Sequence, residues 1–126
     1  MNVLVDTSVW VDHFRNHNAD LTALLLRDEA MTHPMIVVEL SCGHVPAPRA
    51  ETLNAMRLLR PSHQASLNEI SDYIEREKLF GLGCGLVDFA LLASALLTPD
   101  AKLWTLDKRL NALAERFGIG YAPVRQ

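Results

Sequence analysis

The first apolar run of the chain is the feature that most constrains its fold. Residues Asn2 to Val5 are almost entirely apolar and rich in β-branched side chains, the pattern of a strand covered on both faces. Such runs alternate with amphipathic, helix-like stretches such as residues 66–78 and 107–118. This alternation predicts an α/β fold, a single three-layer α/β/α domain with a short, mainly parallel central sheet.

Local signals place the boundaries of several elements. Ser8 is a candidate cap for the helix after the first strand, and Asp20 is a candidate cap for the next one. Pro34 suits the first turn of a third helix. Ser66 begins a capping box, and the stretch 86–97, which is apolar on every side apart from Asp88 in its first turn, predicts a buried helix. Further short extended segments are expected at 31–33, 56–61, 102–106 and 120–124.

Composition narrows the class of protein. With 126 residues, of which 49% are apolar, the chain suits one globular domain over residues 1–126. The net charge is −3, so the overall field does not attract nucleic acid, and any polyanion must be held locally. The candidate phosphate contacts, each of which a solvated surface explains equally simply, are Arg15, Arg49, Arg57, Arg60, Lys108 and Arg109. Since no apolar run approaches the ~20 residues of a membrane span, we expect a cytoplasmic protein. Cys42 and Cys84 lie far apart and predict reduced thiols.

Four acidic residues stand in apolar surroundings at junctions between strands and helices. Asp6 ends the first strand, and Asp107 ends W-T-L-D in the same way. Asp88 falls in the first turn of the apolar helix, and Glu39 is the sole charge in P-M-I-V-V-E-L-S-C. Parallel sheets bind their ligands beyond the carboxyl ends of the strands, where these side chains are expected to meet.

Each of these acids alone is explained as well by helix capping, but together they would repel strongly. Each pair at about 5 Å costs roughly 3 kcal/mol at an effective dielectric near 20. Six such pairs would exceed the ~5 to 15 kcal/mol of stability of a typical domain. Protonation or bound divalent cations must therefore relieve the repulsion. Oxygen ligands of this kind suit Mg²⁺, with Mn²⁺ as a substitute.

Four motifs, in this order and spacing, carry a resemblance to a known family. The motifs are V-L-V-D-T-S-V-W at the start, V-V-E-L in the first third, G-L-V-D-F-A-L-L-A-S-A-L late in the chain, and L-W-T-L-D near its end. Together they resemble the PIN domain, and more closely the VapC-type toxins of toxin–antitoxin pairs. The resemblance covers essentially the whole chain.

The resemblance implies a function as well as a PIN-like α/β/α fold. Family members are metal-dependent ribonucleases that cleave RNA, are inhibited by a cognate antitoxin protein, and tend to dimerise. The resemblance therefore implies a homodimer, or a hetero-oligomer with the antitoxin. The family's catalytic residues map here onto Asp6, Glu39, Asp88 and Asp107, with Ser8 as a helper. The sequence departs from the family pattern at Leu106, often an arginine, and at Leu110, usually an aromatic residue.

The residue types also suit this chemistry without the family. Bare carboxylates would repel a phosphodiester, whereas carboxylates with bound metal attract it and polarise its oxygens. We expect Asp6 and Asp88 to bind the metal directly, and Glu39 and Asp107 to complete the site. The supporting hydroxyls, expected to donate hydrogen bonds to the carboxylates, are Thr7, Ser8 and Thr105.

Three other functions are compatible with parts of the sequence. A non-catalytic PIN-like binding module would keep the fold without the activity. A phosphoaspartyl phosphatase or receiver could use Asp6, but the phosphatase motif has a second acidic residue at the position that Ser8 occupies here. A histidine-based ribonuclease would need paired histidines in a cleft. His13 and His17 have a metal-pair spacing but no third ligand nearby, so we interpret them as surface residues.

Overall fold

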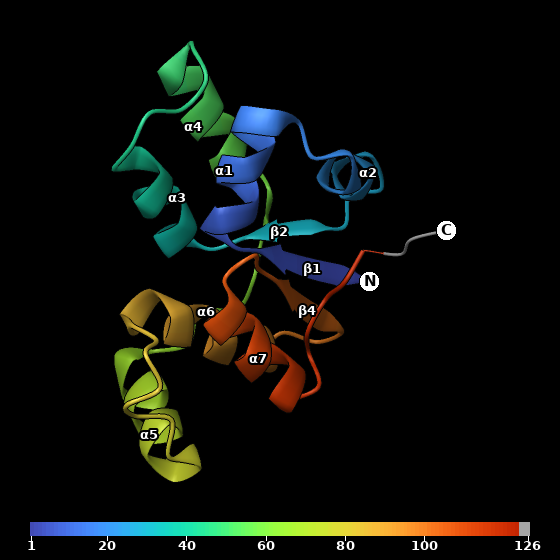
Figure 1. The fold of residues 1–126 in the computed structure, drawn as a ribbon. Helices are drawn as coiled ribbons and strands as arrows, with labels where there is room; N and C mark the ends of the chain where they lie inside the picture. Colours follow the sequence, from blue (N-terminus) through green and yellow to red (C-terminus); the bar gives the residue numbers. More distant parts are fainter. Residues whose placement is uncertain (124–126) are drawn as a thin grey trace.

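The computed structural model of the protein describes residues 1–123 and shows a parallel sheet covered by helices on both faces (Figure 1). In this part of the chain the strands are β1 (Asn2–Val5), β2 (Ala30–Thr32), β3 (Arg60–Pro61) and β4 (Ala101–Trp104). Their order is β3-β2-β1-β4, and all neighbouring pairs are parallel. The predicted α/β class and PIN-like layering are confirmed.

The chain order of the strands decides which helices cover which face. The helices are α1 (Thr7–Asn16), α2 (Ala19–Leu26), α3 (Pro34–Ser41), α4 (Arg49–Arg57), α5 (Leu67–Glu77), α6 (Leu86–Leu97) and α7 (Lys108–Arg116). From β1 to β3 the chain steps outward, whereas from β3 to β4 it returns past β1. Right-handed crossovers then put α1 to α4 on one face and α5 and α6 on the other, as Figure 1 shows.

The core is built around β1 and α6. The side chains of Val3, Leu4 and Val5 are 0% exposed, because β1 is central and covered on both faces. On α6 every residue from Phe89 to Ala95 is buried, as the apolar stretch predicts. None of the helices within residues 1–123 has the length and apolar character that crossing a lipid bilayer requires.

The strand order also locates the binding edge of the sheet. The chain continues from β1 to β2 on one side, whereas β4 lies on the other side of β1. In open α/β sheets such a reversal opens a crevice beyond the carboxyl ends of the two strands. Asp6 directly follows β1, and Thr105 directly follows β4. The topology therefore positions these two side chains at the switch point.

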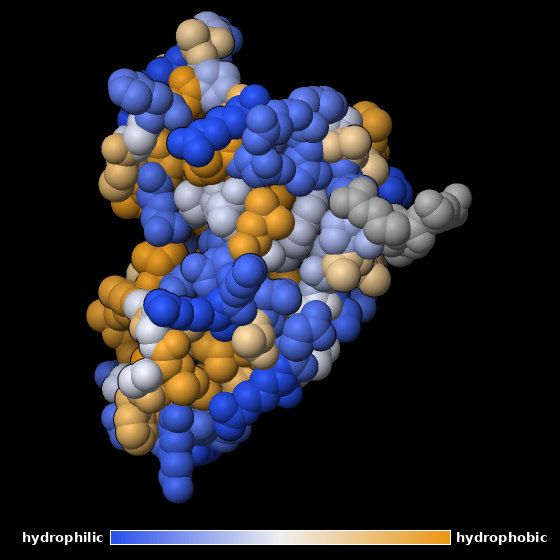
Figure 2. Space-filling view, in the orientation of Figure 1, coloured by the Kyte–Doolittle hydropathy of each residue, from blue (hydrophilic) through white to orange (hydrophobic). Residues whose placement is uncertain are grey.

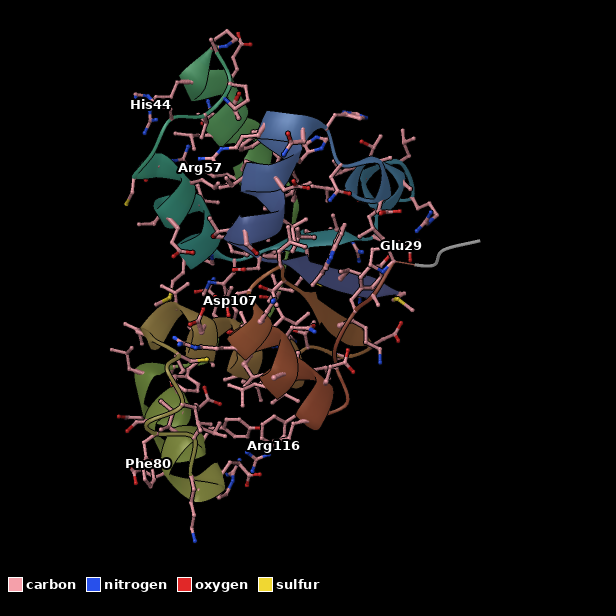
Figure 3. The ribbon with its side chains drawn as sticks, viewed as in Figure 1. Glu29, His44, Arg57, Phe80, Asp107 and Arg116 are labelled. Carbon is pink, nitrogen blue, oxygen red and sulfur yellow. The ribbon has the colours of Figure 1, made fainter. Side chains whose placement is uncertain are left out.

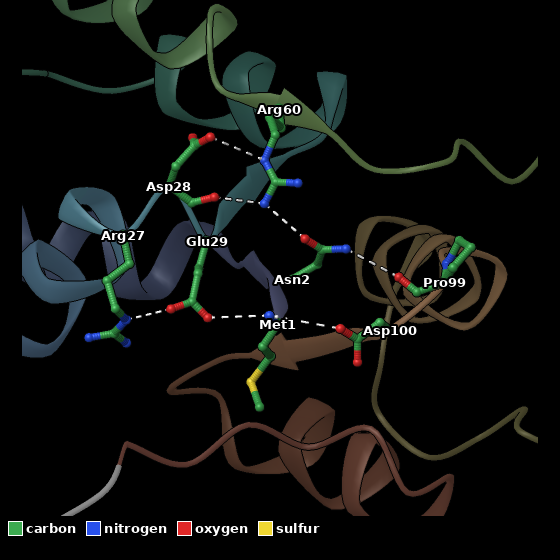
Figure 4. A network of polar contacts seen from close by, with 8 residues as sticks. All are labelled: Met1, Asn2, Arg27, Asp28, Glu29, Arg60, Pro99 and Asp100. Atoms are coloured by element: carbon green, nitrogen blue, oxygen red, sulfur yellow. Dashed lines mark hydrogen bonds and ion pairs between the residues drawn. The ribbon is translucent and has the colours of Figure 1, made fainter.

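Paired charges hold the opposite edge, where all four strands begin (Figure 4). The Arg60 guanidinium donates hydrogen bonds to the Asn2 amide oxygen at 2.8 Å and to the Asp28 carbonyl at 2.7 Å. The N-terminal amine lies 3.5 Å from the Glu29 carboxylate and 3.8 Å from that of Asp100. These contacts join the residues that precede or begin β1, β2, β3 and β4, and so fix the strand starts relative to one another.

The caps of the first two helices differ from the sequence expectation. Asp6, rather than Ser8, is the N-cap of α1, because the Ser8 hydroxyl itself donates to the Asp6 carboxylate. Asn18, rather than Asp20, caps α2 through the Leu21 N–H. In both helices the side chain one position outside the first turn supplies the acceptor.

Two expected strands are shorter in the structure. Helix α4 continues to Arg57, so only Arg60–Pro61 of the expected 56–61 segment pairs as a strand. The expected strand at 120–124 appears as one parallel bridge between Gly120 and Leu103, and its last residue lies outside the described residues.

His33 caps α3 with a buried imidazole whose hydrogen bonding favours the neutral form. The side chain is 4% exposed, and its Nδ1 accepts a hydrogen bond from the Met35 N–H at 3.0 Å. Nε2 is buried and has no hydrogen-bond partner among the described residues. Burial therefore lowers the pKa of His33 from its ordinary value of 6.5.

We predict that this histidine makes stability depend on pH. The unfolded chain takes up the proton at higher pH than the folded one, so the free energy of unfolding falls as the pH drops below 6.5. The contribution of His33 to the change in the free energy of unfolding with pH is at most about 1.4 kcal/mol per pH unit. His33→Asn, which keeps a capping oxygen, should flatten the slope in urea titrations, whereas His44→Asn on the exposed surface should not. An unchanged slope in His33→Asn contradicts this assignment.

Candidate active site

Asp6 is a nearly buried carboxylate at the switch point of the sheet. Its side chain follows β1 and is 6% exposed. Oδ2 accepts hydrogen bonds from the Ser8 hydroxyl at 2.7 Å and from the Thr105 hydroxyl at 2.8 Å. The Ser8 N–H adds a longer contact at 3.4 Å. Charge-assisted hydrogen bonds of this kind stabilise the ionised carboxylate without a salt bridge.

The two hydroxyls are themselves oriented by the backbone of the turn between β4 and α7. The Leu106 N–H donates to the Ser8 hydroxyl at 2.9 Å, and the Asp107 N–H donates to the Thr105 hydroxyl at 3.0 Å. Each hydroxyl has one proton, which is directed to Asp6 because the backbone donors occupy the acceptor side. This network attaches the turn that carries Asp107 to the end of β1.

Asp88 and Asp107 each cap a helix with one oxygen. Asp88 Oδ2 accepts from the Gly85 N–H at 3.0 Å, and Asp107 Oδ1 accepts from the Leu110 N–H at 2.9 Å. Burial raises the pKa of Asp88, the Gly85 hydrogen bond opposes the rise, and the charges of Asp107 and Asp6 add to it. The three aspartates are therefore close enough to influence one another, although they come from three different junctions.

Glu39 joins the group through Thr7. It is the sixth residue of α3 and exposed, rather than early in that helix as the sequence suggested. The Thr7 hydroxyl donates to Glu39 Oε1 at 2.6 Å, which connects α3 to the residue next to Asp6. Figure 2 shows the surface hollowed between the helices of the two faces, and Figure 3 labels Asp107 beside this hollow.

The free oxygens of these carboxylates suit a hard divalent cation. In each of the four side chains one oxygen accepts a hydrogen bond, and the other has none from the described residues; the bonded oxygens are Asp6 Oδ2, Glu39 Oε1, Asp88 Oδ2 and Asp107 Oδ1. Carboxylate oxygens are the donors that Mg²⁺ and Mn²⁺ take in proteins. Within residues 1–123, no three acidic, imidazole or thiol groups are close enough as they stand to share one ion. The donor chemistry thus fits a metal, and the free oxygens are its candidate ligands.

The structure adds Cys84, which the sequence did not assign to the site, and brings Arg109, one of the candidate phosphate contacts in the sequence, to the same loop. Cys84 lies in the loop before α6, where burial raises the pKa of its thiol, Asp88 and Asp107 raise it further, and Arg109 opposes them. Arg109 lies on α7 against Gly83 of the same loop. The glycines of the motif G-L-G-C-G suit a tight turn and a close approach at the rim of the site, whereas the element that approaches, α7, follows from the fold.

The topology and the carboxylates at the switch point define a class of α/β protein with a candidate metal-dependent acidic site. The model of the PIN domain matches residues 3–116, so the chain belongs to the PIN domain family. It is similar to "Ribonuclease VapC32" of Mycobacterium tuberculosis strain CDC 1551 / Oshkosh, with 39% identity over 120 residues, 95% of this chain and 96% of that protein. The protein of the same name from strain ATCC 25618 / H37Rv matches with the same identity and coverage.

We predict that Ser8 and Thr105 stabilise Asp6 jointly. Ser8→Ala and Thr105→Val should each lower the free energy of unfolding by about 1.5 to 3 kcal/mol, because each removes a hydrogen bond to a nearly buried charge. The double variant should lose more than the sum, since the second substitution removes the last hydroxyl from Asp6 Oδ2.

Urea unfolding of the four proteins measures this coupling as a double-mutant cycle. Thr22→Val is the matched control, because the Thr22 hydroxyl bonds only to the carbonyl of Asn18 at 3.2 Å, far from the site in the fold. Additive losses would show that the two hydroxyls act independently.

Proposed function

We propose that this protein is a metal-dependent endoribonuclease and the toxin of a toxin–antitoxin pair. One observation carries the proposal: aspartates from three separate junctions lie near the switch point, where the charges of Asp107 and Asp6 act on Asp88, and each keeps one carboxylate oxygen without a hydrogen bond from the described residues. Membership of the PIN domain family and similarity to proteins named ribonucleases support it. RNA in the cytoplasm is the proposed substrate.

The proposed roles follow from the hydrogen bonds. Asp6 and Asp88 would bind Mg²⁺, or Mn²⁺ in its place, through their free oxygens, with Glu39 and Asp107 completing the site. A bound divalent cation would neutralise the carboxylates and polarise the phosphate oxygens of RNA. The hydroxyls of Ser8 and Thr105 hold Asp6 in one orientation, and the Thr7 hydroxyl does the same for Glu39. Ordered ligands of this kind reduce the reorganisation that catalysis requires.

We predict that RNA cleavage requires a divalent cation and the free aspartate oxygens. Excess EDTA should abolish the cleavage of total RNA, and Mg²⁺ or Mn²⁺ should restore it. Asp6→Asn and Asp88→Asn should each lower the rate about 10³-fold, if a ligand contributes ~4 kcal/mol to the barrier. Each asparagine retains an oxygen for the existing hydrogen bonds, so the melting temperature should be preserved or raised.

Asp72→Asn on the exposed face of α5 is the control for this experiment, since it removes the same charge away from the site. Full activity in EDTA would exclude a metal requirement. A near-normal rate in either asparagine variant would show that another carboxylate is essential, and a wild-type protein without any nuclease activity would favour the non-catalytic module.

The same excess negative charge suits a basic side chain of an antitoxin. A partner helix that places an arginine or lysine among the carboxylates would neutralise them as a metal does. A groove of about 350 Å³ beside α3 is lined by apolar groups of Pro34, Val37 and Val38, and Val38 is 61% exposed. Val38, which lines this groove, directly precedes Glu39 in the sequence, and the groove could receive the apolar face of such a helix. A homodimer, or a hetero-oligomer with the antitoxin, is part of the proposal.

We predict that the partner and the metal compete for the site. Purification of the protein from its native cells should recover a small bound protein, and the complex should not cleave RNA. Titration with Mg²⁺ or Mn²⁺ should restore part of the activity, because both ligands use the same carboxylates. A tight complex with undiminished cleavage would contradict occlusion of the site, and recovery of no partner would contradict the toxin assignment.

A further inference from the structure

Arg109 reaches from α7 to the loop that precedes α6. It lies two residues after Asp107, and its Nη1 forms a long hydrogen bond of 3.5 Å with the Gly83 carbonyl. A Cβ atom on Gly83 would lie 2.8 Å from Nη1, closer than real Cβ atoms approach other atoms, and 3.0 Å from Cζ, so the guanidinium would have to move. The guanidinium therefore occupies the space that the missing side chain of Gly83 leaves.

This cation has no carboxylate partner in residues 1–123, although acidic residues flank it. Asp107 is in the same helical turn, and Asp88 bonds to Gly85, two residues beyond Gly83. A cation in the first turn of a helix is disfavoured by the positive end of the helix dipole. The fold thus holds, at the rim of the carboxylate site, a guanidinium that no carboxylate of the described residues pairs with directly, so its other N–H groups are available to an anion.

We propose that Arg109 binds a phosphate of the RNA chain beside the phosphodiester that is cut, and so positions the strand over the carboxylates. This inference rests on the proposed ribonuclease function. The planar guanidinium can donate two parallel hydrogen bonds to one phosphate, which a lysine ammonium cannot do in the same geometry. Gly83 leaves room for the guanidinium at this position, because a Cβ there would displace it.

RNA affinity and its salt dependence test the proposal. Every protein in this experiment carries Asp6→Asn, so that RNA binds without being cleaved. The probe is a fluorescein-labelled RNA pool of random sequence in the presence of Mg²⁺. The fluorescence anisotropy of the probe measures its binding over a range of KCl concentrations. Adding Arg109→Gln should raise the Kd roughly 10- to 100-fold and lower the slope of log K against log [salt] by about 0.7. Arg109→Lys keeps the positive charge, so it should keep most of the salt dependence of binding, but it should not keep the affinity of arginine.

Lys108→Gln is the charge-matched control, because Lys108 lies in the same turn without a hydrogen bond to the loop among the described residues. It should cause less than half of the loss in affinity caused by Arg109→Gln. Equal effects of the two substitutions, or an unchanged slope in Arg109→Gln, would overturn the proposal. If the wild-type protein cleaves RNA, this result leaves the proposed function intact.

The two glycines of the loop provide a second, independent comparison. Gly83 and Gly81 both have positive φ angles, +84° and +74°, so alanine strains the backbone at both positions. Only at Gly83 does the new Cβ meet Arg109, since nothing lies within 4 Å of the Cβ position at Gly81. Gly83→Ala should therefore raise the KM for RNA, with little further effect when combined with Arg109→Gln.

Gly81→Ala should leave the KM near that of the wild type, and melting curves verify that both alanine variants fold. Equal KM values for the two variants would overturn the role of Gly83 and Arg109. Absence of cleavage in every protein, the wild type included, would instead contradict the proposed function on which this inference rests.

Discussion

The Asp6 carboxylate and its two hydroxyl donors connect the strands on which the site depends. Asp6 follows the central strand β1, and Thr105 follows β4, so the hydrogen bond between them spans the switch point of the sheet. Ser8 then accepts from the backbone of the turn that leads to Asp107. A charge that is only 6% exposed needs these donors, because an unpaired buried carboxylate is very costly. The same contacts that satisfy this charge also fix the turn that carries the next carboxylate.

Helix capping uses only part of each aspartate at the candidate site. Asp6, Asp88 and Asp107 are each an acceptor for a helix N-terminus, yet each uses only one oxygen for that purpose. The helix dipole and the cap stabilise the negative charge locally, which partly offsets the mutual repulsion of the three groups. A carboxylate can therefore contribute to stability through one oxygen while the other oxygen stays available to a ligand.

Local sequence signals predicted many of the helices and strands, but they did not predict the contacts between residues far apart in the chain. The strand Asn2–Val5, the helix 86–97 and the Ser66 capping box all lie where the residue pattern predicts them, because each depends on neighbours in the chain. The strand order and the contact of Arg109 with Gly83 depend on residues far apart in sequence, which periodicity does not reveal. Ser8 was expected to cap α1, but its hydroxyl is committed to Asp6 instead. The four candidate acids could be named from their apolar surroundings, whereas their free oxygens could be identified only from the hydrogen bonds.

The two faces of the sheet contribute different acids, and this has a mechanical consequence. Glu39 lies on α3 in one helical layer, whereas Asp88 begins α6 in the other, and Asp6 lies between them at the end of β1. Because α6 is buried along Phe89 to Ala95, Asp88 is fixed to the core, while the exposed Glu39 is connected to the first residue of α1 through the Thr7 contact. The width of the site is therefore the spacing between two layers that share one sheet. A ligand held by both Glu39 and Asp88 would therefore bridge the two helical layers.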